Sequence, residues 1–302
     1  MSVSKEDFEY IAKLSQEQAA IVLEPGKEYL VESRLGDLAT TMGLGTVQNL
    51  VQTLRGGKAP PDLLPRVIDA LTTNETLFFR DFHPFEALRK TVIPEIMRKR
   101  ADTKQLSIWC GACSTGQEPY SIAMLLREHF PSLADWKISI LATDLSPRVL
   151  KAAEAGSFSQ LEVNRGLPAM YLVKYFTKVN DRWAIKDAVR NVITFRQMNL
   201  MQPWPMMQPV DLVFLRNVMI YFDIATKKSI LKRIRGCLLP HGYLFLGSAE
   251  TTLNLDPAYR SVSADQAVFY SPTPANAGGH GPDGAPPPLP LTPPAQPLRK
   301  AA

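Results

Sequence analysis

From about residue 105 onward, short apolar segments of strand length alternate with stretches of helical periodicity. This alternation predicts an α/β fold with a mostly parallel, doubly wound sheet, because parallel strands need helical crossovers between them. The expected strands are Leu106–Cys110, Ser139–Thr143, Val192–Gln197, Leu212–Leu215, Tyr243–Leu246 and Ala267–Tyr270. Ligands of such sheets bind at the carboxyl ends of the strands, so the residues that follow each strand are the first site candidates.

Other regions flank the expected sheet domain of residues 105–270. Residues 1–72 repeat apolar side chains at three- and four-residue spacing, which predicts an all-α domain. Residues 73–104 are expected to be a linker that also caps the ligand edge of the sheet. The periodicity breaks at 157–198, where we expect a small inserted β-subdomain with a hairpin. The Pro-rich residues 271–302 have no aromatic residue and are expected to form a disordered tail.

Charge and composition exclude several classes of partner. The net charge of +5 arises from 34 basic and 29 acidic residues without a dense Lys/Arg stripe, so nucleic acid is not expected. No apolar run approaches the roughly 20 residues that span a bilayer, so no direct membrane insertion is expected. The N-terminus lacks a signal sequence and three cysteines are too few for a disulfide framework. We therefore expect a cytoplasmic protein with reduced thiols.

The strongest local signal is a strand that runs into a small-residue turn and then a helix, within Leu106-Ser-Ile-Trp-Cys-Gly-Ala-Cys-Ser-Thr-Gly-Gln-Glu-Pro-Tyr120. Such a turn lets the backbone pass beneath a ligand and offers free N–H groups at the helix start. The dinucleotide fingerprint is incomplete, since the middle glycine between Gly111 and Gly116 is missing. This favours a ligand without a pyrophosphate, although a purely structural turn remains an alternative.

Polar residues also follow the other expected strands. Asp144 ends the second strand, where an acidic residue can accept hydrogen bonds from ribose hydroxyls. Its alternative role is to cap the helix that begins near Ser146. Asn199, Arg216 and Asn217 occupy equivalent positions after later strands, and they too can instead satisfy loop backbone groups.

A polar and aromatic segment, Leu71-Thr-Thr-Asn-Glu-Thr-Leu-Phe-Phe-Arg-Asp81, joins the helical region to the sheet. A segment at such a junction can reach over the ligand edge, because small-molecule sites prefer domain interfaces. The alternative is a capped helix start with Phe78 and Phe79 in a core.

Other chemistry has little support in the sequence. Cys110 and Cys113 have the spacing of a metal-binding pair, but no second pair exists, and we expect no metal. The four histidines are scattered, without a nucleophile in a triad-like arrangement. Pro240-His-Gly242 is expected to be a turn between a helix and a strand.

Taken in chain order, these segments resemble the CheR-type chemotaxis receptor methyltransferases over about residues 5–270. The resemblance rests on Thr72-Thr-Asn-Glu-Thr-Leu-Phe-Phe-Arg80, on Trp109 to Ser121, on Ala142-Thr-Asp144, on Asn199-Leu200, and on Arg216-Asn-Val-Met-Ile-Tyr-Phe222. Each string alone is modestly specific, whereas the set is highly specific.

The resemblance implies a Rossmann-like methyltransferase sheet and the transfer of a methyl group from S-adenosylmethionine to glutamate side chains of chemoreceptor cytoplasmic helices, in chemotaxis adaptation. S-adenosylhomocysteine would be the second product, and no metal is involved. On the family pattern, Asp144 holds the ribose, Glu118 and Arg80 lie near the methionine end, and Leu200 flanks the adenine. The residues at cofactor-binding positions are Asn74, Thr76, Arg80, Glu118, Asp144, Asn199, Leu200, Arg216 and Asn217.

The absence of an obvious catalytic histidine agrees with this chemistry. A glutamate carboxylate has a reference pKa of about 4.3, so at neutral pH it is already a nucleophile and needs no general base. We expect Arg80 to orient the incoming carboxylate and Tyr221 to donate a hydrogen bond to it; both assignments come from position and from the resemblance.

The resemblance also implies partners. Residues 1–72 would dock on the receptor, and Lys27 and Arg34 are the candidate contacts. The hairpin of the 157–198 insertion lacks a glycine-rich expansion, so we expect no dependence on a C-terminal receptor pentapeptide. A regulatory protein and recruitment to receptor arrays at the membrane are further candidates. Two alternatives remain: a methyltransferase of another protein or small molecule, and a non-catalytic module that senses S-adenosylmethionine.

Overall fold

The N-terminal region is helical in the computed structural model, which describes residues 3–57 and 59–273. Its helices are α1 (Lys5–Ala19), α2 (Glu28–Thr41), α3 (Val47–Arg55) and α4 (Leu63–Leu71). The side chains of Ser4 and Thr46 accept hydrogen bonds from backbone N–H groups in the first turns of α1 and α3, as N-cap residues do. Ile11, Val31 and Leu50 belong to a separate buried core of this region.

A seven-stranded sheet follows, with strand order β6-β2-β1-β7-β8-β10-β9 among the described residues. Neighbouring strands from β6 to β8 pair in parallel, whereas β10 pairs antiparallel with both β8 and β9. The strands are β1 (Gln105–Gly111), β2 (Lys137–Asp144), β6 (Ile193–Gln197), β7 (Val210–Leu215), β8 (Leu238–Leu246), β9 (Tyr259–Ala264) and β10 (Ala267–Pro272). The predicted doubly wound sheet is confirmed, and β9 is the strand that the sequence prediction missed.

Helices cover both faces of this sheet, which is why its central strand β7 is buried along its whole length. Phe214 of β7 faces one buried cluster, whereas Val213 and Leu215 face the other. Side chains of α7 join the first cluster and side chains of α12 join the second. The helices that flank the sheet are α5 (His83–Ala87), the π-helical turn η1 (Leu88–Val92), α6 (Ile93–Lys99), α7 (Gln117–His129), the short 3-10 turn η2 (Pro131–Leu133), α8 (Pro147–Ala155) and α12 (Ile224–Cys237).

The segment 73–104 does more than link two domains. Phe85, Leu88 and Ile96, from α5, η1 and α6, are buried in the first of these clusters, so this segment supplies a helical layer of the sheet domain. Its first part, from Thr73 to Asp81, reaches the carboxyl ends of the strands, where Arg216 contacts Arg80 and Asp81.

The inserted subdomain is a small antiparallel sheet of order β3-β5-β4. The predicted hairpin is present over 176–185. Residues 169–175, directly before it, form a helix because Tyr171 and Tyr175, one turn apart, bury the same face. Ile193–Gln197 pairs with β2 in the main sheet, so the expected insertion of 157–198 is too long at its C-terminal end. The elements are β3 (Ser157–Ser159), α9 (Gln160–Asn164), α10 (Ala169–Tyr175), β4 (Phe176–Val179), β5 (Arg182–Ile185) and α11 (Asp187–Arg190).

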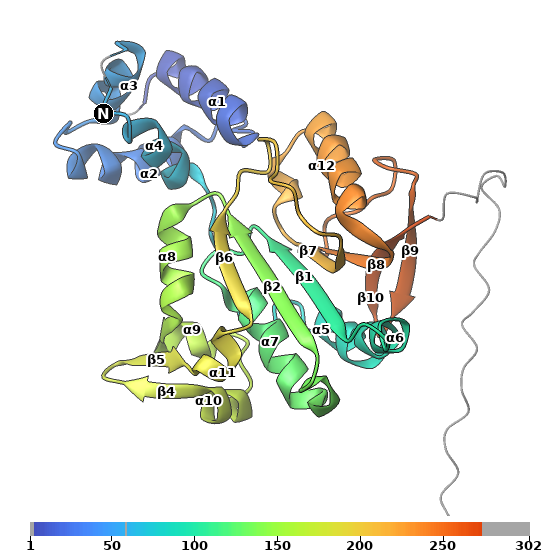
Figure 1. The fold of residues 1–302 in the computed structure, drawn as a ribbon. Coiled ribbons are helices and arrows are strands. Elements are labelled where there is room, and N and C mark those ends of the chain that lie inside the picture. The colour runs from blue at the N-terminus through green and yellow to red at the C-terminus, as the bar shows by residue number, and fades with distance from the viewer. Residues whose placement is uncertain (1–2, 58, 274–302) are drawn as a thin grey trace, which may run out of the picture. The chain divides into compact units, whose positions relative to one another are not determined.

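Figure 1 shows helices α1 to α4 near one end of the central strands, and the inserted sheet beside α8 and α9. Strand β10 continues to Pro272, so the first two residues of the predicted tail belong to the sheet, and residues 274–302 lie outside the described part of the chain. Across residues 3–57 and 59–273, no helix has the length and apolar character needed to cross a membrane.

Candidate active site

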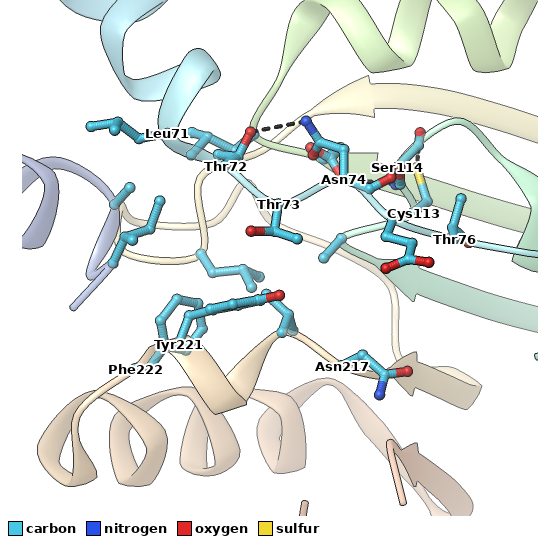
Figure 2. Close-up of a pocket in the computed structure, with 18 of the residues that line it drawn as sticks. Leu71, Thr72, Thr73, Asn74, Thr76, Cys113, Ser114, Asn217, Tyr221 and Phe222 are labelled. Carbon is cyan, nitrogen blue, oxygen red and sulfur yellow. Dashed lines mark hydrogen bonds between the residues drawn. The ribbon is translucent and has the colours of Figure 1, made fainter. Parts of the chain in front are cut away.

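A pocket lies at the carboxyl ends of β1, β2 and β7, and segments of the helical region also line it. Its walls bring together all ten site residues predicted from the sequence, which come from regions far apart in the chain. They are Asn74, Thr76, Arg80, Glu118, Asp144, Asn199, Leu200, Arg216, Asn217 and Tyr221. Figure 2 shows Thr73 and Asn74 on one side of this pocket and Tyr221 on the facing side.

The turn after β1 forms the floor of the pocket. Ala112 and Ser114 have positive φ angles of 53° and 50°, and Gly116, at 93°, opens helix α7. The Ser114 amide donates a hydrogen bond of 2.8 Å to Oδ2 of Asp144. The predicted small-residue turn therefore aligns the ends of β1 and β2 beneath the pocket.

Asp144 is buried at the end of β2, and both of its carboxylate oxygens accept backbone hydrogen bonds. Oδ1 accepts from Ser146 at 3.0 Å and Oδ2 accepts from Ser114. Burial raises the pKa of Asp144 above its ordinary value, against the lowering effect of these amides. Ser146 is the N-cap residue of α8, so the alternative role of Asp144 as that cap is excluded. Each oxygen keeps a lone pair with which to accept from a ligand hydroxyl.

An ionic cluster centred on the buried Arg216 lies at the same end of the sheet. The Arg216 guanidinium donates hydrogen bonds to Oε2 of Glu118 at 2.9 Å and to Oδ2 of Asp81 at 2.7 Å. Its Nε is buried without a hydrogen-bond partner among the described residues. Burial raises the pKa of Glu118 even though Arg216 opposes the shift. The pocket thus contains a buried acidic side chain that Arg216 holds in place.

Asp81 was not predicted as a site residue, and it anchors a strained segment. Phe79, Asp81 and Phe82 have φ angles of 48°, 67° and 47°, in the region that non-glycine residues rarely adopt. Arg216 donates to the Arg80 carbonyl oxygen as well as to the Asp81 carboxylate. These two contacts hold the segment so that Arg80, between the strained residues, lines the pocket.

The connection between α4 and the sheet is fixed by side chains on both sides. Ser114 Oγ donates to the Asn74 carbonyl oxygen at 2.7 Å, and Asn74 Nδ2 donates to Thr72 Oγ1 (Figure 2). Arg34 of α2 donates to the Leu71 carbonyl oxygen and to Thr73 Oγ1. Arg34, predicted as a receptor contact, is therefore engaged in holding the connection in place.

The segment after α1 closes the opposite side. The Val22 amide donates to the Tyr221 carbonyl oxygen at 3.1 Å, and Asn199 Nδ2 donates to the Gln18 carbonyl oxygen at 2.8 Å. Asn199 Oδ1 in turn accepts from the Met201 amide. Both polar ends of the Asn199 side chain thus have intramolecular partners, so this residue shapes the wall.

Thiol and metal chemistry have no support here. Cys110 and Cys113 are both buried, and burial raises the pKa of each thiol well above its ordinary value. Within the described residues, no group of three or more His, Cys, Asp or Glu side chains is arranged to hold a metal ion.

Lys27, the other predicted receptor contact, pairs with Glu24 at 2.9 Å and lines the pocket.

Comparisons with known proteins match the helical region and the sheet domain to the same family. Residues 6–72 match the family model described as CheR methyltransferase, all-alpha domain, and residues 74–268 match the CheR methyltransferase, SAM binding domain. Chemotaxis protein methyltransferase 1 of Pseudomonas aeruginosa is 43% identical over 277 residues, which cover 89% of this chain and 99% of that protein. Chemotaxis protein methyltransferase Cher2 of Pseudomonas putida is 41% identical over 278 residues, with coverage of 89% and 99%.

Proposed function

The chain belongs to the CheR methyltransferase family, and on that premise we propose that it methylates glutamate side chains on the cytoplasmic helices of chemoreceptors. It is an S-adenosylmethionine-dependent methyltransferase of chemotaxis, and the product of the proposed reaction is a glutamyl methyl ester. The observation that carries the proposal is the pocket itself, in which Asp144, Glu118, Arg80 and Tyr221 meet at the carboxyl ends of the strands.

Polar and apolar residues of the pocket would contact different parts of the cofactor. Asp144 would accept from the ribose hydroxyls, and the buried Glu118 would pair with the cationic amino group. Leu200, which is buried in the second core cluster and lines the pocket, would lie against the adenine. Arg216 would act by holding Glu118 in place. When bound, S-adenosylmethionine supplies an electrophilic methyl group.

The protein's task toward the acceptor is placement, because a glutamate carboxylate is ionised at neutral pH. Arg80 lines the pocket, and one of its guanidinium nitrogens donates to the Glu75 carbonyl oxygen, which leaves other N–H donors to orient a carboxylate. Tyr221 would add a hydroxyl donor from the facing wall. Alignment of this kind can contribute roughly 7–11 kcal/mol when it is fully realised.

The test is to incubate the protein with labelled S-adenosylmethionine and a panel of receptor cytoplasmic fragments, and to look for alkali-labile methyl esters. Arg80→Ala and Tyr221→Phe should each lower kcat at saturating cofactor, by about a hundredfold for the arginine. Arg127→Ala and Tyr270→Phe are matched controls, because both residues lie outside the helical region and neither lines the pocket. If both pocket variants keep the wild-type kcat, the assigned roles are wrong; cofactor binding without transfer to any fragment would instead favour a sensing module.

The inserted subdomain supports action without a receptor pentapeptide. Its hairpin joins β4 to β5 through only Asn180 and Asp181, with no expanded loop. Micromolar binding of an aromatic-ended receptor pentapeptide in a calorimetric titration would contradict this proposal.

We also propose that the protein acts in the cytoplasm on receptor arrays.

A further inference from the structure

The turn that carries Asn217 and Tyr221 is held by a carboxylate that does not itself line the pocket. Glu250 follows β8 and accepts hydrogen bonds from five backbone amides. Its Oε2 accepts from Gly247 at 2.6 Å and Asn217 at 2.8 Å; its Oε1 accepts from Val218 at 2.9 Å, Met219 at 2.7 Å and Ile220 at 3.3 Å.

The local backbone explains why one carboxylate can take so many donors. Asn217 has a φ angle of 59°, and the short 3-10 turn η3 (Met219–Tyr221) follows it. Successive amides at the start of a helical turn have no partners within the turn, and they point the same way. A charged acceptor at that place satisfies them together, and such charge-assisted hydrogen bonds are stronger than neutral ones.

The loop that brings Glu250 to this turn is packed backbone against backbone. A Cβ atom added to Gly247 would lie 2.9 Å from the backbone nitrogen of Asn217, closer than real Cβ contacts come, and also close to Nδ2 of Asn217 (2.7 Å) and Oε2 of Glu250 (2.8 Å). No larger residue fits at 247 unless the turn moves. The turn is also held at its far end, where the Tyr221 carbonyl oxygen accepts from Val22.

We propose that Glu250 is a positioning residue for methyl transfer, which sets Tyr221 and Asn217 against the pocket by filling the amide nest of residues 217–220. For its effect on turnover this inference rests on the proposed function. Glu250→Ala empties the nest, which a small free carboxylate such as formate then refills. Glu250→Gln instead turns an amide NH₂ toward at least two of the five N–H donors, so keeping the shape of the side chain does not restore the turn.

The experiment compares the full-length wild type, Glu250→Ala, Glu250→Gln and Glu250→Asp, with and without formate. Amide hydrogen exchange followed by mass spectrometry reports on residues 217–220, and methyl transfer to a receptor fragment reports on turnover. In Glu250→Ala we expect faster exchange at these amides and a kcat lowered about a hundredfold, as displacements of about 1 Å can cause. Formate should restore slow exchange and kcat in Glu250→Ala but not in Glu250→Gln. Glu250→Asp keeps the charge on a shorter side chain, so its exchange rate and kcat should lie between those of Glu250→Ala and the wild type.

Asp256→Ala is the matched control. Asp256 lies in the same region after β8, accepts from the Ala258 amide at 3.0 Å and pairs with Arg235, and it does not line the pocket. Its loss should lower stability without changing exchange at residues 217–220 and without a response to formate.

Two results would overturn the proposal: wild-type kcat in a folded Glu250→Ala, or an increase in exchange that spreads over the whole chain and is insensitive to formate. If Glu250→Ala does not fold, the Asp and Gln variants decide by their order of kcat. If the wild type methylates no receptor fragment, the proposed function fails, and the exchange and formate measurements still decide whether Glu250 holds the turn.

Discussion

Strand β7 has a buried charged residue near each end, and the two ends do different work. Near its start, Asp211 accepts hydrogen bonds from the Ser107 amide at 2.8 Å and from His241 Nε2 at 2.9 Å, with Arg100 Nε 3.3 Å away. Directly after its end, Arg216 binds Glu118 and Asp81.

The difference lies in what surrounds each cluster. Both oxygens of Asp211 have partners within the fold, and the residue lines no pocket found in the described part of the chain. At the other end the loops diverge from the carboxyl ends of parallel strands and leave a crevice, into which Glu118 and Arg216 face. A buried charge is therefore not by itself the mark of a site; its place at the carboxyl end beside a pocket is.

The largest effect that would sharpen this comparison comes from Arg216→Met. Removal of the arginine leaves the buried Glu118 without its cationic partner, which should lower the free energy of unfolding by about 3–5 kcal/mol. Affinity for S-adenosylhomocysteine should fall as well, because Glu118 and Arg80 lose their support. Urea unfolding and calorimetry measure the two effects.

The matched control for this variant is Arg100→Met at the other end of the strand. It also removes an arginine from beside a buried carboxylate, so stability should fall while affinity for S-adenosylhomocysteine stays at the wild-type value. Equal losses of affinity in the two variants would remove the distinction between the two ends.

Asp211→Asn should have a smaller effect. The amide keeps one acceptor oxygen but loses the charge that faces Arg100 and His241, and hydrogen bonds to charged groups contribute about 1.5–3 kcal/mol. We expect a loss of stability in that range with unchanged cofactor affinity in the folded fraction. A drop in affinity that matches the loss of stability would show that the start of β7 is coupled to the pocket.

The same strand shows how far sequence reasoning extends. Its apolar run predicted β7, and its place before Arg216 and Asn217 predicted that these residues line a ligand site, because strand ends follow from local pattern. Pro240-His-Gly242, expected to be a turn, instead lies within β8 at a register irregularity that brings His241 onto Asp211. No local pattern encodes that pairing.

Asp81 and Glu250 were missed by the sequence prediction for the same physical reason. Asp81 looked like the end of a polar segment, and Glu250 lay in a loop after a strand. Their roles come from contacts with Arg216 and with the amides of residues 217–220, which are far away in the chain. A carboxylate that binds backbone amides carries no signature in its own neighbourhood, so only the folded structure could identify it.

The smallest expected effect is a pH dependence at the pocket end of the strand. Burial raises the pKa of Glu118 from its ordinary value of 4.5, with Arg216 opposing. The native state therefore holds this proton at pH values where the unfolded chain has released it. Between 4.5 and the raised pKa, the contribution of Glu118 to the free energy of unfolding falls as pH rises.

Cofactor binding should show the opposite sign. A cationic amino group beside Glu118 favours the ionised form, so affinity for S-adenosylhomocysteine should rise with pH through this interval, by at most about tenfold per unit, and then level off. Calorimetry in buffers of different ionisation enthalpy would detect the proton released on binding.

Glu118→Gln should abolish the dependence of affinity on pH. Glu86→Gln should keep it, because hydrogen bonds from Arg89 and Lys90 hold the pKa of Glu86 down at about 2 against burial, so that this group is already ionised throughout the range. A slope that survives in Glu118→Gln would mean that another group senses the ligand's charge and that the carboxylate beside Arg216 is structural, as Asp211 is.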